Sequence, residues 1–237
     1  MNDIIPDSPT KPYDMYEVIG AIVDNGEFLE IQKDYAKNII IGFARFNGQS
    51  VGIVANQPKY LAGVLDSNAS RKGARFVRFC DAFNIPVLSL TNVKGYEATL
   101  CSEKKIAKAV AKLTYAFANA TVPKVNVIIG KAYGSAYVAM NSKAIGADIT
   151  ICWPDAEIGS MDATLAAKIM YYGQSADVVK EKAAEYAALQ TSATGAAKRG
   201  YVDQIIEAAD TRKYVIGAFE MLFTKREDRP SKKHGTV

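Results

Sequence analysis

A short run of small residues, Gly134-Ser135-Ala136, offers the clearest means of chemistry in this sequence. It follows the apolar segment 125–130, which predicts a buried strand, and we expect a helix to open near Gly134. The first amides of a helix have no acceptor within it, and the helix dipole adds partial positive charge there. The backbone N–H groups of Ser135 and Ala136 could therefore hold a developing oxyanion. The alternative is an ordinary strand-to-helix turn, in which glycine only allows close packing.

Side chains that usually catalyse reactions are missing from the interior of the sequence. The single histidine, His234, lies close to the C-terminal Val237, so we expect no Ser-His-Asp or Cys-His site in the core. Ser135 does not fit the nucleophile motif G-x-S-x-G, because both flanking glycine positions are tyrosine. Neither a P-loop nor a G-x-G-x-x-G turn follows an expected strand. These absences exclude hydrolase triads, P-loop nucleotide sites and dinucleotide-dependent redox enzymes.

Composition narrows the class further. The three cysteines, Cys80, Cys101 and Cys152, are far apart and form no C-x-x-C pair, so we expect neither a disulfide scaffold nor a metal site. The 237 residues are 49% apolar and 23% charged, which is typical of a globular protein. A net charge of +4 that is concentrated nowhere argues against nucleic-acid binding. With no signal-like start and no apolar run of about 20 residues, we expect a soluble cytoplasmic protein without membrane insertion.

Three other polar groupings have two interpretations each. The loop Asn92-Val93-Lys94-Gly95-Tyr96 follows an expected strand and could contact a ligand, or it could be a plain surface loop. Two rows of cations could each steer an anion or form a solvated helix face. They are Ser70-Arg71-Lys72 with Arg75 and Arg78, and Lys104, Lys105, Lys108 and Lys112.

The elements that must position these residues alternate between strands and helices. Asp14 and Glu17 form a capping box that predicts a helix start, and Asn47-Gly48 predicts a hairpin between strands 38–46 and 49–56. Because the strands are continuously apolar, we expect an α/β fold with a covered sheet. We divide the chain into a linker-like arm (1–13), one domain (14–224) and a charged, exposed tail (225–237). Further strands are expected at 85–91, 125–130 and 148–153, and helices at 70–83, 103–120, 162–190 and 211–224.

Several long blocks resemble the C-terminal half of the carboxyltransferase subunit of biotin-dependent acyl-CoA carboxylases and decarboxylases. The propionyl-CoA and methylmalonyl-CoA members look nearest. The stretch 4–19 resembles the linker between the two halves of single-chain members, which implies a split enzyme with its N-terminal-type half on a separate polypeptide. The matching blocks follow the family order over nearly the whole chain: YAKNIIIGFAR (35–45), NQPKYLAGVLDSNASRKGARFVRFCDAFNIPV (56–87), YAFANATVPKVNVIIGKAYGSAY (115–137), PDAEIGSM (154–161), AAKRGYVDQIIEAADTR (196–212) and KKHG (232–235).

The resemblance implies a crotonase-like fold of repeated β-β-α units. It also implies biotin on a separate carrier protein or domain, a coenzyme A thioester of a short acyl group as substrate, and no metal in this chain. The implied partners are the N-terminal-type carboxyltransferase half, a biotin carboxyl carrier protein, and further copies of the chain in a trimer or a hexamer-like ring. The implied activity is transfer of a carboxyl group between biotin and the acyl-CoA.

The resemblance also assigns roles to residues. The backbone N–H groups of Ser135 and Ala136 would face the ureido oxygen of biotin, and serine preserves the amide where the family usually has a second glycine. Val138 would line the acyl pocket. The remaining residues that the resemblance places at the biotin site are Gly134, Tyr137, Gly95 and Tyr96.

Two departures from the family pattern leave alternatives open. In the stretch 94–108 lysines and alanines replace a Gly-rich helix start, and Asp162 stands where the family usually has glycine. One alternative is a catalytically degenerate subunit that scaffolds an active partner. Another is a stand-alone crotonase-type acyl-CoA hydratase or isomerase, which needs a carboxylate at the active site. Asp162 and Glu157 are the candidates for that carboxylate.

Overall fold

The computed structural model describes Ile4 and residues 13–230, so most of the predicted arm and the end of the predicted tail lie outside it. The strands are β1 (Phe28–Ile31), β2 (Ile39–Phe46), β3 (Gln49–Asn56), β4 (Val87–Val93), β5 (Lys124–Tyr133), β6 (Ile149–Cys152), β7 (Glu157–Gly159) and β8 (Gln204–Ile205). The α-helices are α1 (Met15–Ile22), α2 (Ser67–Ala82), α3 (Leu100–Asn119), α4 (Gly134–Ala139), α5 (Ala163–Met170), α6 (Ala176–Tyr186), α7 (Ala193–Lys198) and α8 (Thr211–Met221).

The strands of the described chain form one eight-stranded sheet with the order β1-β2-β3-β4-β5-β6-β8, and β7 pairs with the far end of β5. The first three strands are antiparallel, and β3, β4, β5, β6 and β8 run parallel. The β2–β3 hairpin confirms the predicted turn, because Asn47 and Gly48 have φ of 51° and 80°. β1, β7 and β8 were not expected from the sequence.

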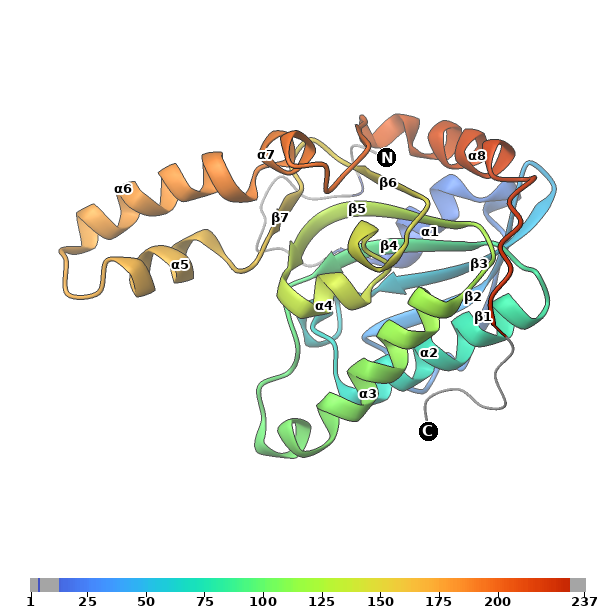
Figure 1. Cartoon of the computed structure of the whole chain (residues 1–237), viewed down its shortest axis with the longest axis horizontal. Helices are drawn as coiled ribbons and strands as arrows, with labels where there is room; N and C mark the ends of the chain where they lie inside the picture. Colours follow the sequence, from blue (N-terminus) through green and yellow to red (C-terminus); the bar gives the residue numbers. More distant parts are fainter. Residues whose placement is uncertain (1–3, 5–12, 231–237) are drawn as a thin grey trace.

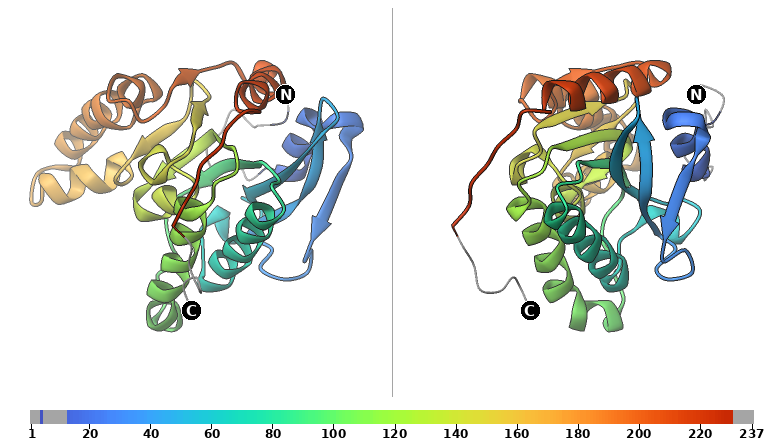
Figure 2. Two further views of the ribbon diagram at one scale, coloured as in Figure 1. Left: turned by 45° about the vertical axis from the view of Figure 1, so that its right-hand side comes forward. Right: turned by 90° about the vertical axis from the view of Figure 1, so that its right-hand side faces the viewer.

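Helices cover both faces of this sheet (Figure 1). One apolar cluster lies between the sheet and α2, α3 and α4, and the other lies between the sheet and α1 and α8. Figure 2 shows α1 on the opposite side of the strands from α2 and α3. Burial on both faces explains why the central strands are apolar at nearly every position. The predicted covered α/β sheet is confirmed.

Side-chain caps determine where α1, α2 and α3 begin. The carboxylate of Asp14 accepts the amide of Tyr16 at the start of α1, as predicted. Asp66 caps α2 through the amide of Ala69, and Thr99 caps α3 through the amide of Ser102. Helices α2 and α3 therefore begin three residues earlier than the apolar spacing predicts, because the spacing locates a buried face and the cap locates an end.

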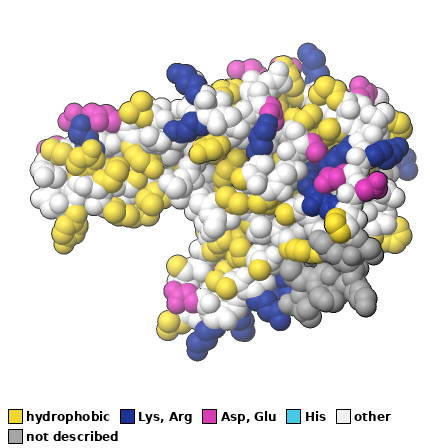
Figure 3. Space-filling model, in the orientation of Figure 1, with side chains coloured by type: hydrophobic (Ala, Val, Ile, Leu, Met, Phe, Trp, Pro, Cys, Tyr) yellow, Lys and Arg dark blue, Asp and Glu magenta, His cyan; other side chains and the backbone are white. Residues whose placement is uncertain are grey.

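Helices α5 and α6 form a hairpin that projects away from the sheet, with α7 at its base (Figure 1). The sequence predicts one helical stretch over 162–190, but Gly173 adopts φ 84° between two separate helices. Hydrophobic side chains gather along one side of the hairpin (Figure 3). On α5, the side chains of Leu165, Ile169 and Met170 are each more than half exposed.

Lys72 of α2 does not belong to the row of cations in which the sequence places it. It is buried, and its ammonium donates hydrogen bonds to the carbonyl oxygens of Tyr35 (2.7 Å) and Ile39 (2.8 Å). Burial lowers the pKa of Lys72. This lysine ties α2 to the loop before β2. The other cations of that row form the exposed face: Arg71, Arg75 and Arg78.

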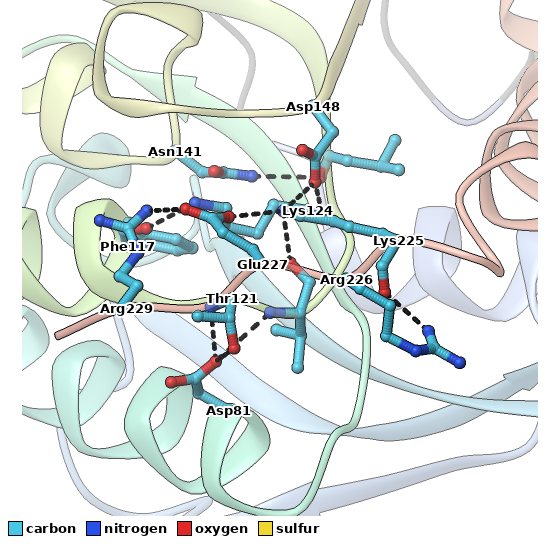
Figure 4. Close-up of polar contacts among 12 residues, drawn as sticks. Asp81, Phe117, Thr121, Lys124, Asn141, Asp148, Lys225, Arg226, Glu227 and Arg229 are labelled. Carbon is cyan, nitrogen blue, oxygen red and sulfur yellow. Dashed lines mark hydrogen bonds and ion pairs between the residues drawn. The ribbon is translucent and has the colours of Figure 1, made fainter. Parts of the chain in front are cut away.

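The segment after α8 is tied by Lys225 to the residues just before β5 and β6 (Figure 4). The Lys225 ammonium donates to the carbonyl oxygen of Val122 (3.2 Å) and to Asp148 Oδ2 (2.9 Å), and its side chain is 13% exposed. The expectation of an exposed tail is therefore wrong for this residue. Beneath it lies Lys124 of β5, which is fully buried and donates to the carbonyl oxygen of Phe117 at 2.8 Å.

Candidate functional site

A pocket of about 420 Å³ opens at the carboxyl ends of β5 and β7, beside the starts of α4 and α5. The chain turns sharply here, because Gly134 has φ 59° and a Cβ at this position would come within 3.1 Å of the Ser160 carbonyl oxygen. Glycine thus permits both the turn and the close approach of the segment that follows β7. The lining residues are Lys94, Gly95, Lys131, Tyr133, Gly134, Ser135, Ala136, Ser160, Met161, Asp162 and Leu165.

Ser135 and Ala136, the two residues expected to supply amides, both line the pocket. They lie in the first turn of α4, for which the described residues supply no side-chain cap. First-turn amides have no acceptor inside their own helix, and the helix dipole favours negative charge beside them. Ser135 is exposed and Ala136 is buried. The wall of the pocket can therefore stabilise an oxyanion.

The other predicted site residues divide into two groups. Gly95 and Gly134 line the pocket with Ser135 and Ala136. Tyr96 packs against the core on the α2–α3 side of the sheet, and its hydroxyl is buried without a hydrogen-bond partner among the described residues. Tyr137 is 8% exposed in the same core, and Val138 is half-buried. These three residues are not part of the pocket lining that the described chain forms.

A lysine, a tyrosine and a glutamate on neighbouring strands form a polar group that the sequence reasoning did not identify. Lys131 of β5 lies directly opposite Glu157 of β7 in the parallel register, and Lys131 Nζ is 3.9 Å from Glu157 Oε1. The Tyr133 hydroxyl donates to Glu157 Oε2. Burial, followed by this hydrogen bond, raises the pKa of Tyr133 well above its usual value. Alternate spacing on one strand relates Lys131 to Tyr133, but nothing in the sequence indicates the short partner strand β7.

Asn92 fixes the end of β4 against β5 below the pocket. Its side-chain Nδ2 donates to the Tyr13 hydroxyl (2.9 Å), and its Oδ1 accepts the backbone amide of Lys131 (3.0 Å). Its own amide donates to Asn56 Oδ1 at 3.1 Å. The β4–β5 register shifts between Thr91 and Val93, so the Asn92 side chain replaces regular strand pairing there. The loop 92–96 is therefore part of the site's support as well as of its wall.

Both carboxylates beside the pocket already have partners within the chain. Glu157 accepts the Tyr133 hydroxyl, as described above. Asp162 caps α5, and its Oδ1 accepts the amides of Thr164 (3.0 Å) and Leu165 (3.2 Å). These hydrogen bonds occupy carboxylate oxygens that a catalytic base would have to turn toward its substrate. In the region that the structure describes, no three His, Cys, Asp or Glu residues gather as a possible metal site. No helix there is both long and apolar enough to cross a membrane.

Comparison with known proteins gives one consistent result. Residues 1–237 match the family described as the carboxyl transferase domain. The propionyl-CoA carboxylase beta chain of Saccharopolyspora erythraea is 49% identical over 249 residues, which cover 100% of this chain and 45% of that protein. The methylmalonyl-CoA decarboxylase subunit alpha of Veillonella parvula is 49% identical over 239 residues, which cover 100% of this chain and 46% of that protein. The chain thus spans about half the length of these relatives.

A solved structure agrees with these relatives. The transcarboxylase 12S hexamer with methylmalonyl-coenzyme A and methylmalonic acid bound has a TM-score of 0.96 and 46% identity to this chain. The match covers 99% of this chain and 46% of that one. The crotonase-like fold expected from the resemblance is confirmed by this similarity. Together with the family match over every residue, it establishes that the chain belongs to the carboxyl transferase domain family.

Proposed function

We propose that this chain is one half of a split biotin-dependent acyl-CoA carboxyltransferase. The observation that carries the proposal is that the pocket lies where the family resemblance locates the biotin site, with the amides of Ser135 and Ala136 on its wall. The proposed partners are a separate N-terminal-type half, a biotin carboxyl carrier protein and further copies of this chain in a trimer or hexamer-like ring. Its location is proposed to be the cytoplasm.

The size and the chemistry of the pocket support the proposal that it binds the ring system of biotin. Its volume of about 420 Å³ lies within the range of small-molecule sites. Gly95 and Gly134 leave the backbone accessible on two sides, and the α4 amides offer donors to a ring oxygen. Carboxylated biotin, when bound, supplies the carboxyl group for the transfer. The proposed acyl substrate is a short uncharged group such as propionyl, with Val138 in the acyl pocket.

The contribution of the chain is electrostatic. The first-turn amides of α4 would hold the ureido oxygen of bound biotin and stabilise negative charge on it, and fixed donors of this kind need no reorganisation. Loss of one comparable donor costs about 3 kcal/mol, or roughly a hundredfold in rate. No side chain of this half needs to transfer a proton. A hydratase or isomerase instead needs a free carboxylate, and the hydrogen bonds to Glu157 and Asp162 disfavour that role.

The test compares Ala136→Pro with Ala136→Gly in the complex of this chain with its complementary half. Proline deletes the amide at a position that makes no intrahelical hydrogen bond, whereas glycine keeps it. We expect Ala136→Pro to abolish carboxyl transfer to the acyl-CoA while the complex still assembles, as measured by size-exclusion chromatography. Ala136→Gly should retain most of the activity. Full activity of the proline variant would refute the proposal and favour a subunit that only scaffolds an active partner.

A further inference from the structure

Lys131 differs from the buried lysines Lys72 and Lys124 in the hydrogen bonds of its ammonium group. Lys72 and Lys124 are buried, and their ammonium groups donate to backbone carbonyl oxygens. Lys131 lies on the pocket wall with a side chain that is 24% exposed. Within the described residues its Nζ makes no hydrogen bond, and its ion pair with Glu157 is long, at 3.9 Å. The three N–H donors of this ammonium are therefore available to a ligand in the pocket.

The position of Lys131 is nevertheless well defined. The backbone amide of Lys131 donates to Asn92 Oδ1, and Glu157 is the residue that pairs with Lys131 in the β5–β7 register. The Tyr133 hydroxyl holds that carboxylate from the other side. The Lys131 ammonium also lies 5.9 Å from the centre of the Tyr133 ring. Because Tyr133 fixes the Glu157 carboxylate and the ion pair to Lys131 is long, the Lys131 ammonium stays at the pocket wall and its N–H donors stay unoccupied.

The charges around the pocket favour a negatively charged ligand. Lys94 and Lys131 both line it, together with the first-turn amides of α4. The acidic residue of the lining, Asp162, directs its oxygen to the amides of its own helix. An ammonium group forms only ordinary hydrogen bonds with an uncharged ring, but it forms stronger, charge-assisted hydrogen bonds with a ring that carries a carboxylate.

We propose that Lys131 binds the carboxylate of the carboxyl group that biotin carries into this pocket. The inference rests on the proposed function and adds a separate site to it: the α4 amides hold the ureido oxygen, and Lys131 recognises the attached carboxylate. Lys131 stays protonated and forms no covalent bond. The pocket thereby distinguishes the loaded carrier from the unloaded one. A charge-assisted hydrogen bond of this kind corresponds to roughly tenfold to a hundredfold in affinity.

Equilibrium binding to the complex of the two halves tests this recognition. The probes are biocytin, which has an uncharged ring, and its N1-carboxymethyl derivative, a stable analogue that carries a carboxylate. We expect the wild type to bind the derivative at least tenfold more tightly than biocytin. Lys131→Met should remove most of that preference while the affinity for biocytin stays unchanged. Lys131→Arg should keep the preference, because it keeps the charge.

Two controls separate the possible outcomes. Lys108→Met removes the same charge from the exposed face of α3 and should leave both affinities unchanged. Unchanged thermal unfolding confirms that Lys131→Met is folded.

The inference is overturned if Lys131→Met keeps the wild-type preference for the carboxylated probe. It is also overturned if Lys131→Met weakens the binding of both probes equally, which indicates a merely structural role. If Ala136→Pro abolishes transfer in that case, the proposed function stands and only the role of Lys131 fails. Full activity of Ala136→Pro, together with binding of neither probe, refutes both.

Discussion

Lys124 provides a quantitative test of how this fold handles a buried charge. Its side chain is fully buried in β5, where its ammonium donates to the Phe117 carbonyl oxygen. Burial, and then the nearby positive charge of Lys225, lower the pKa of Lys124 from 10.5 to about 8. Asp148 and Glu227 act in the opposite direction but do not compensate. At pH 7 the folded protein therefore contains a protonated lysine in an environment that disfavours the proton.

The pKa difference fixes both the size and the sign of the effect. Between about pH 8 and pH 10.5 the unfolded chain binds the proton more tightly than the folded chain does, so the stability from this group rises with pH. The total is roughly 3 kcal/mol, since each unit of pKa corresponds to about 1.4 kcal/mol. Lys124→Met removes this titration. Between pH 7 and pH 10 the wild type should gain about 2 kcal/mol of stability from this group, and the variant should lack that gain. The free energy of unfolding of the variant minus that of the wild type should therefore become more negative by the same amount.

Urea denaturation at pH 7, 8, 9 and 10 measures this difference directly. Other groups that titrate in this range cancel, because they are common to both proteins. Lys108→Met serves as the control, since its side chain is exposed and its effect should not change with pH. A stability difference between Lys124→Met and wild type that is constant from pH 7 to pH 10 would refute the reasoning.

Two further predictions concern half-buried side chains that accept backbone amides. Asp81 Oδ1 accepts the backbone amides of Thr121 (2.6 Å) and Val122 (3.3 Å) between α3 and β5, so Asp81→Ala should lower the free energy of unfolding by about 1–3 kcal/mol. Urea denaturation measures this, and Asp34→Ala at an exposed ion pair should change little. Asn92→Ala removes the acceptor of the Lys131 amide. Loss of this hydrogen bond should lower the free energy that protects the amide by roughly 1–3 kcal/mol, so the amide should exchange with deuterium at least tenfold faster. Unchanged exchange of that amide would contradict the role given to Asn92.

Local patterns predicted much of the fold because each has a local physical cause. Asn47-Gly48 tolerates two positive φ angles, so these two residues alone are enough to predict the hairpin turn, although in the fold Asp24 also accepts both of their backbone amides. Asp14 marks the start of α1 for a similar reason. The β1 strand was missed because four residues that are at most half-buried carry little alternation, and it exists through pairing with β2. The β7 strand has only three residues and depends on β5.

The same division holds for the candidate site: its local turn was predictable from the sequence, but its tertiary contacts were not. The Gly134-Ser135-Ala136 turn is visible in the sequence because a strand delivers small residues to a helix start. Lys131 looks like any strand-end lysine until Glu157 is brought opposite to it by tertiary structure. The same limit applies to Lys72, which belongs to a charged row by spacing but faces the loop before β2. Spacing predicts which residues share a face of an element, but the neighbours of that face come from the whole fold.

The order of the strands has a consequence for how copies of this protein can associate. The sheet ends in β1 on one side and in β8 on the other, and these strands are four and two residues long. Such short edges offer few free N–H and C=O groups to a foreign strand. Growth by strand addition, the common route to fibrous aggregates, therefore finds little template here. Association must instead use side-chain surfaces, such as the exposed apolar side of the α5–α6 hairpin.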